Sequence, residues 1–150
     1  MSTPAPPPAP PPGPPPASDP DPDLVRRRAH LAGVADSLRA LHKQLMNEAR
    51  SDFERERGPV PSAAAFLGLL MGDPFFAWLR PLSGAMAELD ELLDAEAPGP
   101  HHARLVRVRF EALVTEEGEG DFPARYREFL QRSSEVVVAH AMVRLALRPL

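Results

Sequence analysis

His140 is the side chain of this sequence whose type and surroundings best suit acid–base or ligand chemistry. It lies between Val137, Ala141 and Arg144, at the polar edge of an apolar stripe with helical spacing. Because an imidazole changes charge near neutral pH, this histidine could act as a general base or as a haem ligand. The alternative, which we favour, is a packed histidine whose ring is hydrogen-bonded to a backbone carbonyl.

Arg80 is the second candidate, because it stands between Leu79 and Pro81 inside an apolar segment. A guanidinium in such a place could clamp a carboxylate or stack on the ring of Trp78. We favour the simpler alternative, an ion pair with Asp73 or with an acidic group on a neighbouring helix.

Metal ligands with the spacing that helical bundles use are missing from the sequence. Di-metal centres in bundles take Glu-x-x-His pairs, and no Glu stands three residues before a His. The adjacent His101 and His102 lie in a Pro-Gly segment, which favours polar surface. The absence of cysteine excludes disulfides and thiolate ligands. With no nucleophile arrangement or phosphate-binding glycine loop, the sequence indicates no catalytic residue, no metal and no cofactor, and favours a protein that is not an enzyme.

The charge distribution argues against a nucleic-acid partner. The chain carries 17 basic and 21 acidic residues, for a formal net charge of -4. Arg26 to Arg28 follow an acidic tail end, and Arg104 and Arg107 precede acidic residues on the same segment. We interpret both clusters as solvated faces, because a phosphate backbone requires a strongly basic surface.

The apolar segment 63–82 concentrates large side chains that must be buried somewhere. Only Asp73 and Arg80 carry charge in it. Such a density of apolar groups packs either inside the fold or against a partner, and the sequence leaves both possibilities open. If these side chains line a small-molecule pocket instead, Arg80 or His140 would be its polar handle. The candidate interaction or pocket residues are Phe66, Met71, Phe75, Phe76, Trp78, Arg80 and His140.

The elements that must position these residues begin after a proline-rich tail. Residues 1–22 hold 12 of the 20 prolines and have little to bury, which predicts a disordered tail that acts as a solvated spacer. Residues 23–150 form a single predicted helical domain.

Helix signals recur throughout residues 23–150. Leucines every seven residues from Leu24 to Leu45 predict one helix of about 33 residues, capped by Asp21 or Asp23 and ended by Gly58. Ser62 and Asp73 cap two further pieces, and Pro81 kinks or breaks the second of them.

The C-terminal third also reads as helical. Residues 102–115 alternate like a strand, yet no second strand candidate exists, so helix is favoured. Phe122 and Pro123 open the last predicted helix, whose apolar side continues to Leu145. Within it the run Val136 to Val138 is apolar around most of the circumference, which predicts cover on several sides. We therefore expect an all-α fold, an up-down bundle of four to five helices.

Part of this sequence resembles a known group of proteins. The run GDPFFAWLRPLSGAMAELDELLD, preceded by LHKQLMNEARSDFERERGPV, is similar to a group of uncharacterised bacterial helical proteins across about residues 38–95. The resemblance implies a compact all-helical domain and no activity. An arginine-rich, lysine-poor composition also suggests a bacterial source.

The leading functional hypothesis is a non-enzymatic helical module that binds a protein partner or forms a homo-oligomer. Its basis is the surplus of apolar surface on the first helix, the aromatic segment and the last helix. The alternative is a bundle, or an enzyme, that binds a small molecule or cofactor in an apolar aromatic pocket. No secretory signal or membrane span is visible, so we expect a soluble, cytoplasmic protein.

Overall fold

The computed structural model describes residues 1–5, 7–13, 18–95, 97–115 and 118–149, and in these ranges it is all-helical, with no strand. The all-α prediction is confirmed, although the described residues form six α-helices where we expected four to five. In chain order the elements are α1 (Pro22–Arg57), α2 (Ala63–Gly72), the 3-10 helix η1 (Pro74–Leu79), α3 (Arg80–Asp94), α4 (Pro100–Val114), α5 (Asp121–Arg132) and α6 (Ser134–Ala146).

Helix α1 is the central element, and its boundaries follow from local chemistry. The Asp21 carboxylate accepts a hydrogen bond from the Asp23 N–H at 3.0 Å, which caps the helix start. Gly58 ends the helix with a φ of 90°, a conformation that favours glycine. The leucines spaced by seven, from Leu31 to Leu45, are fully buried, because one face of α1 lies against the rest of the fold along its length.

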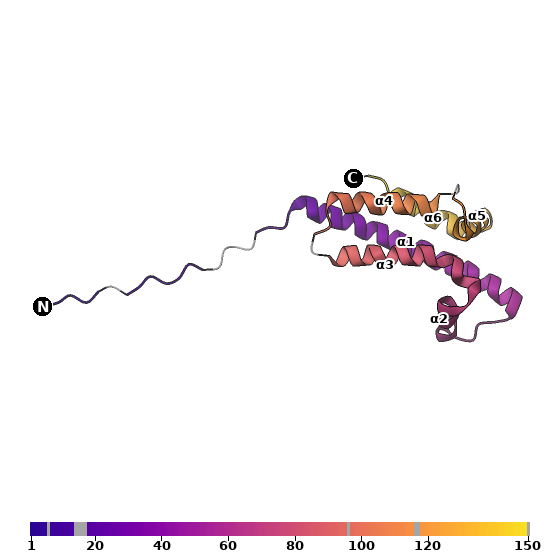
Figure 1. Cartoon of the computed structure of the whole chain (residues 1–150), viewed down its shortest axis with the longest axis horizontal. Helices are drawn as coiled ribbons and strands as arrows, with labels where there is room; N and C mark the ends of the chain where they lie inside the picture. The colour runs from indigo at the N-terminus through magenta and orange to yellow at the C-terminus, as the bar shows by residue number, and fades with distance from the viewer. Residues whose placement is uncertain (6, 14–17, 96, 116–117, 150) are drawn as a thin grey trace.

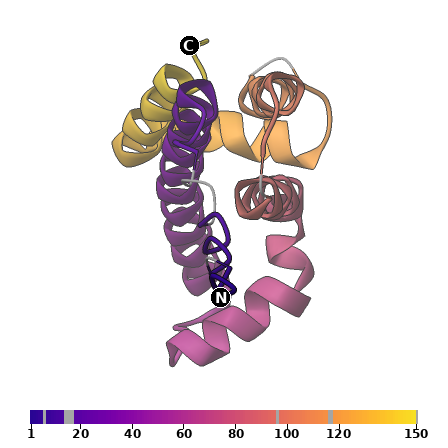
Figure 2. The ribbon, with the colours of Figure 1, turned by 90° about the vertical axis from the view of Figure 1, so that its left-hand side faces the viewer.

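The other helices are arranged around α1. Figure 1 shows α1, α3, α4 and α6 lying lengthwise, while α5 is seen end-on and α2 lies below the far end of α1. Helices α3 and α6 pack directly on α1, and α4 packs mainly on α3. Seen along the long axis in Figure 2, α5 crosses between the α4 side and the α6 side, and α2 crosses below. Helix α6 therefore has α1 and α5 as its principal neighbours.

The proline-rich tail lies apart from the helices. Its described residues form neither helix nor strand, and Figure 1 shows them leading away from the start of α1. Helix α1 begins at Pro22, the last residue of the range that we assigned to the tail. Residue 6 and residues 14–17 fall outside the described part of the chain. Disorder of the tail stays a prediction.

The aromatic segment contributes to the core through η1. Asp73 caps η1 by accepting from the Phe75 N–H at 2.9 Å, and Pro74 occupies its first position. Phe76 and Trp78 are buried in η1, with Trp78 7% exposed. Pro81 lies in the first turn of α3, where its missing N–H needs no partner. The predicted break near Pro81 is thus a division into η1 and α3.

Two expectations about the C-terminal third have different outcomes. The helix over residues 102–115 is confirmed as α4. The expectation that Val136 to Val138 are covered on several sides is wrong: Val136 is fully buried, but Val137 and Val138 are exposed. The physical reason is that helices pack on only one side of α6, so its opposite side remains open.

Candidate interaction surfaces

The aromatic candidates from the sequence pack on one another and on the core, and among them Phe75 and Trp78 line a common hollow. Phe66, Phe75 and Phe76 gather with Phe53 of α1 at the far end of the molecule, with ring centroids 5.1 to 5.6 Å apart. Trp78 packs on the rings of Phe122 and Phe129 of α5. These edge and tilted ring contacts stabilise the junction of α1, η1 and α5.

The two remaining candidates of the aromatic segment lie on the surface. Met71 is 73% exposed at the end of α2, and Arg80 is exposed at the start of α3. The expected ion pair between Arg80 and Asp73 is not formed. Asp73 pairs with Arg57 of α1 instead, at 3.2 Å. This ion pair links the end of α1 to the cap of η1.

His140 has a side-chain partner where we expected a backbone carbonyl. Its Nδ1 lies 2.6 Å from the hydroxyl of Tyr126, and the two groups share a hydrogen bond between α6 and α5. Tyr126 is fully buried, so this bond satisfies a hydroxyl that has no access to water. His140 is thus a packed histidine whose bond to Tyr126 joins α6 to α5, and the expected bond to a backbone carbonyl stays a prediction.

The outer face of α6, which we define as Val137, Val138, Ala141, Met142 and Leu145, is a continuous apolar surface. Its four large side chains are 44–64% exposed. On the inner side of the same helix Val136, Ala139 and Val143 are buried against the fold. A solvent-facing side of a helix is normally polar. This helix is therefore apolar on two sides but covered on one.

A shallow hollow of about 390 Å³ extends the outer face of α6 onto α1. Ala40 and Gln44 line it from α1, and Val138 and Met142 line it from α6. Ala40 is exposed, and a small side chain at this place lets another surface approach closely. On its α1 side the outer face of α6 is therefore bordered by a small side chain, which leaves room for another surface.

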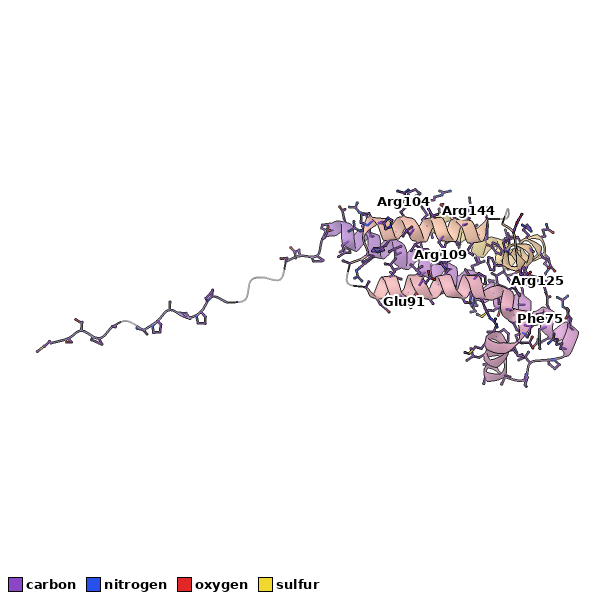
Figure 3. All side chains as sticks on the ribbon, viewed as in Figure 1. Phe75, Glu91, Arg104, Arg109, Arg125 and Arg144 are labelled. Carbon is purple, nitrogen blue, oxygen red and sulfur yellow. The ribbon has the colours of Figure 1, made fainter. Side chains whose placement is uncertain are left out.

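The two ends of α6 carry opposite charges. Glu135 lies in the first turn and Arg144 in the last, with Arg148 just beyond. The pKa of Glu135 lies below its usual value because hydrogen bonds stabilise the carboxylate, first from its own backbone N–H and then from the hydroxyls of Ser134 and Ser133. The acidic end therefore stays ionised at neutral pH. Figure 3 labels Arg144 along the upper side of the molecule.

Helix α2 is the second apolar surface. It contains no charged residue and none of its residues is buried. Phe66, Leu69 and Leu70 are partly buried against the core, whereas Leu67 and Met71 are exposed. Ten residues make this surface smaller than that of α6.

A third apolar feature is a groove of about 460 Å³ between α3 and α4. Leu89, Leu92, Leu105, Val108 and Phe110 are among the residues that line it. Its rim carries an ion pair, in which Arg109 donates to the carboxylate of Glu88. At the start of α4 the His102 ring accepts a hydrogen bond from the Gly99 N–H. The groove is apolar with few polar groups, as small-molecule sites commonly are.

His42 forms a polar contact between α1 and α3. Its Nε2 lies 2.9 Å from the Ser83 hydroxyl, which in turn donates to the Leu79 carbonyl. Since the hydroxyl has only one proton to donate, Nε2 must be the donor toward Ser83. Burial lowers the pKa of His42 from its usual 6.5. The ring is therefore neutral at pH 7 and has a structural role.

Two absences hold for the described part of the chain. No three His, Asp or Glu side chains there gather where they could hold a metal ion. Among the described helices, none combines the length and apolar character that crossing a bilayer requires.

No protein-family model, curated protein or solved structure matches this chain. The resemblance of residues 38–95 to bacterial helical proteins gains no support from these comparisons. The function must therefore be argued from the surfaces themselves.

Sequence reasoning overlooked two features of these surfaces. It offered the surplus apolar surface of the last helix as a basis for partner binding, but it expected Val136 to Val138 to be covered on several sides, because helical spacing does not say which neighbours exist. It also treated the arginines of α1 and α4 as separate clusters, although the fold brings them together, as described below. A signal for the first was present, namely a 13-residue helix with apolar groups around most of its circumference.

Proposed function

We propose that this protein is a non-enzymatic helical interaction module that self-associates through the outer face of α6. The observation that supports it is the exposure of Val137, Val138, Met142 and Leu145 on a helix whose other side is already packed. An apolar surface left open by the fold is the usual mark of a protein–protein contact.

The occupant that best fits this face is a second copy in antiparallel orientation. Two antiparallel α6 helices bring the acidic start of one, at Glu135, near the basic end of the other, at Arg144 and Arg148. A parallel arrangement would place like charges together. Antiparallel packing also aligns the helix dipoles favourably.

The size of the face indicates a weak, reversible dimer. Eight side chains, four from each copy, are each about half exposed and would be buried in the dimer. Full burial of one such side chain is worth about 1.5–3 kcal/mol, so the gross gain is roughly 6–12 kcal/mol. Association costs an estimated 4–15 kcal/mol. We therefore expect a Kd on the order of micromolar to millimolar.

Sedimentation equilibrium of the full chain over a wide concentration range tests the proposal. The wild type should show a monomer–dimer equilibrium, and Val138→Glu/Met142→Glu should be monomeric at every concentration. Circular dichroism must show that this variant keeps its helical content. The matched control is Leu67→Glu/Met71→Glu, which places the same charges on the exposed side of α2 and should leave the dimer intact.

Two outcomes would contradict the proposal. If the wild type stays monomeric up to millimolar concentration, self-association is excluded. If the α2 variant dissociates and the α6 variant does not, the protein self-associates through α2 and the assignment to α6 fails. The orientation is tested by charge reversal: Glu135→Arg and Arg148→Glu should each weaken the dimer, and the double variant should regain affinity.

A second candidate function is supported by the groove between α3 and α4. An apolar small molecule with one polar group would lie along Leu92 and Leu105, with its polar end beside the Arg109–Glu88 ion pair. Binding of an environment-sensitive dye to the wild type tests this candidate, and Val108→Glu is the variant that should block the groove. Unchanged dye binding by that variant contradicts it. The aromatic residues of η1 do not line this groove, so the candidate does not depend on them.

The remaining expectations complete the proposal. We infer a single helical domain at 23–150 in an up-down arrangement, with the tail 1–22 as a disordered spacer. We also infer a bacterial, cytoplasmic setting without a nucleic-acid partner. Amide resonances of the non-proline tail residues that relax like those of the packed helices would contradict the spacer.

A further inference from the structure

A hollow of about 240 Å³ lies where α1, the start of α4 and the segment after α6 meet. We call it the arginine pocket. It is lined by Arg27, His30, Pro100, Ala103, Arg104, Arg107 and Pro149. Figure 3 labels Arg104 on α4, at the upper side of the molecule. Three arginines and a histidine thus line one hollow whose other lining residues are apolar.

The two arginines from α4 differ from most arginines of this protein. Arg109, two residues further along the same helix, donates to Glu88, and Arg39 of α1 donates to both Asp36 and Asp90. Arg104 and Arg107 form no ion pair with any described residue. Like charges gathered in one place repel each other and destabilise the fold until an anion joins them.

Arg27 is held in place by the fold. Its Nε donates to the Pro98 carbonyl at 3.1 Å, and its side chain is only 20% exposed. The terminal NH2 group lies 4.0 Å from a carboxylate oxygen of Asp21, beyond hydrogen-bond distance. One edge of this guanidinium is thus fixed while its terminal nitrogen has only a loose ionic neighbour.

We propose that the arginine pocket binds a phosphoryl dianion carried by a small soluble molecule. Guanidiniums present paired N–H donors that match phosphate oxygens, and here they come from two helices, Arg27 from α1 and Arg104 and Arg107 from α4. His30 adds a further ring nitrogen to the same hollow. A dianion relieves the repulsion among these cations better than a single carboxylate does.

The surroundings of the pocket select against long anionic polymers. The acidic residues Asp19, Asp21 and Asp23 lie just before and at the start of α1, where Asp21 is near Arg27 and Asp23 pairs with Arg26. A nucleic-acid strand that extends past the pocket would meet these carboxylates, whereas a small phosphorylated molecule fits within the hollow. Asp21 is the carboxylate that the ligand displaces from Arg27. The proposal does not depend on self-association through α6.

The experiment titrates the full chain with inorganic phosphate at constant ionic strength, with chloride as the balancing anion. Backbone amide shifts of Ala103 to Arg107 should change saturably, and the melting temperature should rise with phosphate concentration. Arg104→Gln/Arg107→Gln should raise the phosphate Kd at least tenfold. The matched control is Arg109→Gln, which removes a positive charge from the same helix and should change the Kd less than twofold.

Further arms identify the source of the phosphoryl group. Glycerol phosphate should bind as inorganic phosphate does, and Asp21→Asn should tighten both several-fold. Phosphatidylcholine vesicles with phosphatidic acid should not sediment the protein. If the protein sediments with such vesicles but does not bind phosphate itself, the proposal of a soluble ligand is wrong. Unsaturable shifts, or equal losses in the Arg109→Gln and Arg104→Gln/Arg107→Gln variants, show only general charge screening and overturn the pocket.

Discussion

Asp52 connects α1 to α5, and its replacement by alanine should destabilise the fold by about 2 kcal/mol. This carboxylate is 9% exposed and, with Ser133, is one of two buried polar residues among those the structure describes. One oxygen accepts from Arg55 and the other from Arg132, in the last turn of α5. The Arg132 guanidinium also lies 4.4 Å from the centre of the Phe129 ring. The substitution therefore breaks the polar contact that fixes the end of α5.

The magnitude follows from the exposure of the two partners. Breaking a fully buried ion pair costs about 3–5 kcal/mol, whereas an exposed pair is worth about 0–1 kcal/mol. The side chains of Arg55 and Arg132 are 67% and 33% exposed, so both regain some water when Asp52 is removed. The Arg132 contact supplies most of the loss. An effect of about 2 kcal/mol corresponds to a melting temperature lower by about 8 °C for a domain of this size.

Urea unfolding followed by tryptophan fluorescence and circular dichroism measures this loss. The lone Trp78 packs on Phe122 and Phe129, so its emission reports directly on the α5 contact. The matched control is Asp36→Ala, because Asp36 lies on the same helix and pairs with Arg39 on the surface. It should change the free energy of unfolding by less than about 0.5 kcal/mol.

A double-mutant cycle with Arg132→Gln separates the pair from other effects of the substitution. The coupling free energy between Asp52 and Arg132 should be about 1–2 kcal/mol, because each single substitution already removes the shared contact. The reasoning is refuted if Asp52→Ala unfolds at the wild-type urea concentration. It is also refuted if the two substitutions are additive, since Asp52 would then contribute without Arg132.

Three further predictions concern the core, a histidine and a helix end. Leu38→Ala removes a fully buried side chain and should lower the free energy of unfolding by about 2–5 kcal/mol in urea titrations. Burial lowers the folded-state pKa of His42, so the unfolded state binds the proton first as pH falls. Stability should therefore decrease as pH falls from about 6.5 toward the lowered pKa, and His42→Gln should flatten this dependence in urea titrations at pH 5 to 7.5. Gly58→Ala should cost about 1–2 kcal/mol by thermal unfolding because of its φ of 90°, although space for the methyl group is open.

Local sequence signals located several helix boundaries but missed the division between α5 and α6. The single last helix predicted from Phe122 onward is wrong, because α5 ends at Arg132 and Ser133 caps a new helix, α6. Asp21, Ser62, Asp73 and Gly58 were each assigned to a helix end, and each caps or ends an element of the structure. These assignments succeed because a cap is a contact between residues two to four positions apart, which the sequence displays directly. Pro81 predicted a kink or a break, because proline lacks the backbone N–H that a helix interior needs, and the structure has a division into η1 and α3.

The candidate residues were less predictable, because their partners are distant in the sequence. Nothing near His140 indicates that the Tyr126 hydroxyl will be its partner, and nothing near Asp73 indicates Arg57. The arginine pocket is the clearest case, because Arg27 and Arg104 come from helices that meet only in the folded chain. Composition had indicated only two solvated basic clusters.

The sequence alone determined that this chain is helical, where several of its helices begin or end, and which stripe of α1 is buried. These properties depend on hydrophobic periodicity and on capping, both of which act over one or two helical turns. Only the tertiary structure decided which apolar faces have neighbours. Val136 and Val138 are equally apolar and two residues apart, yet one is buried and the other exposed. The reason is that cover depends on how many helices surround α6, and no short stretch of sequence contains that number.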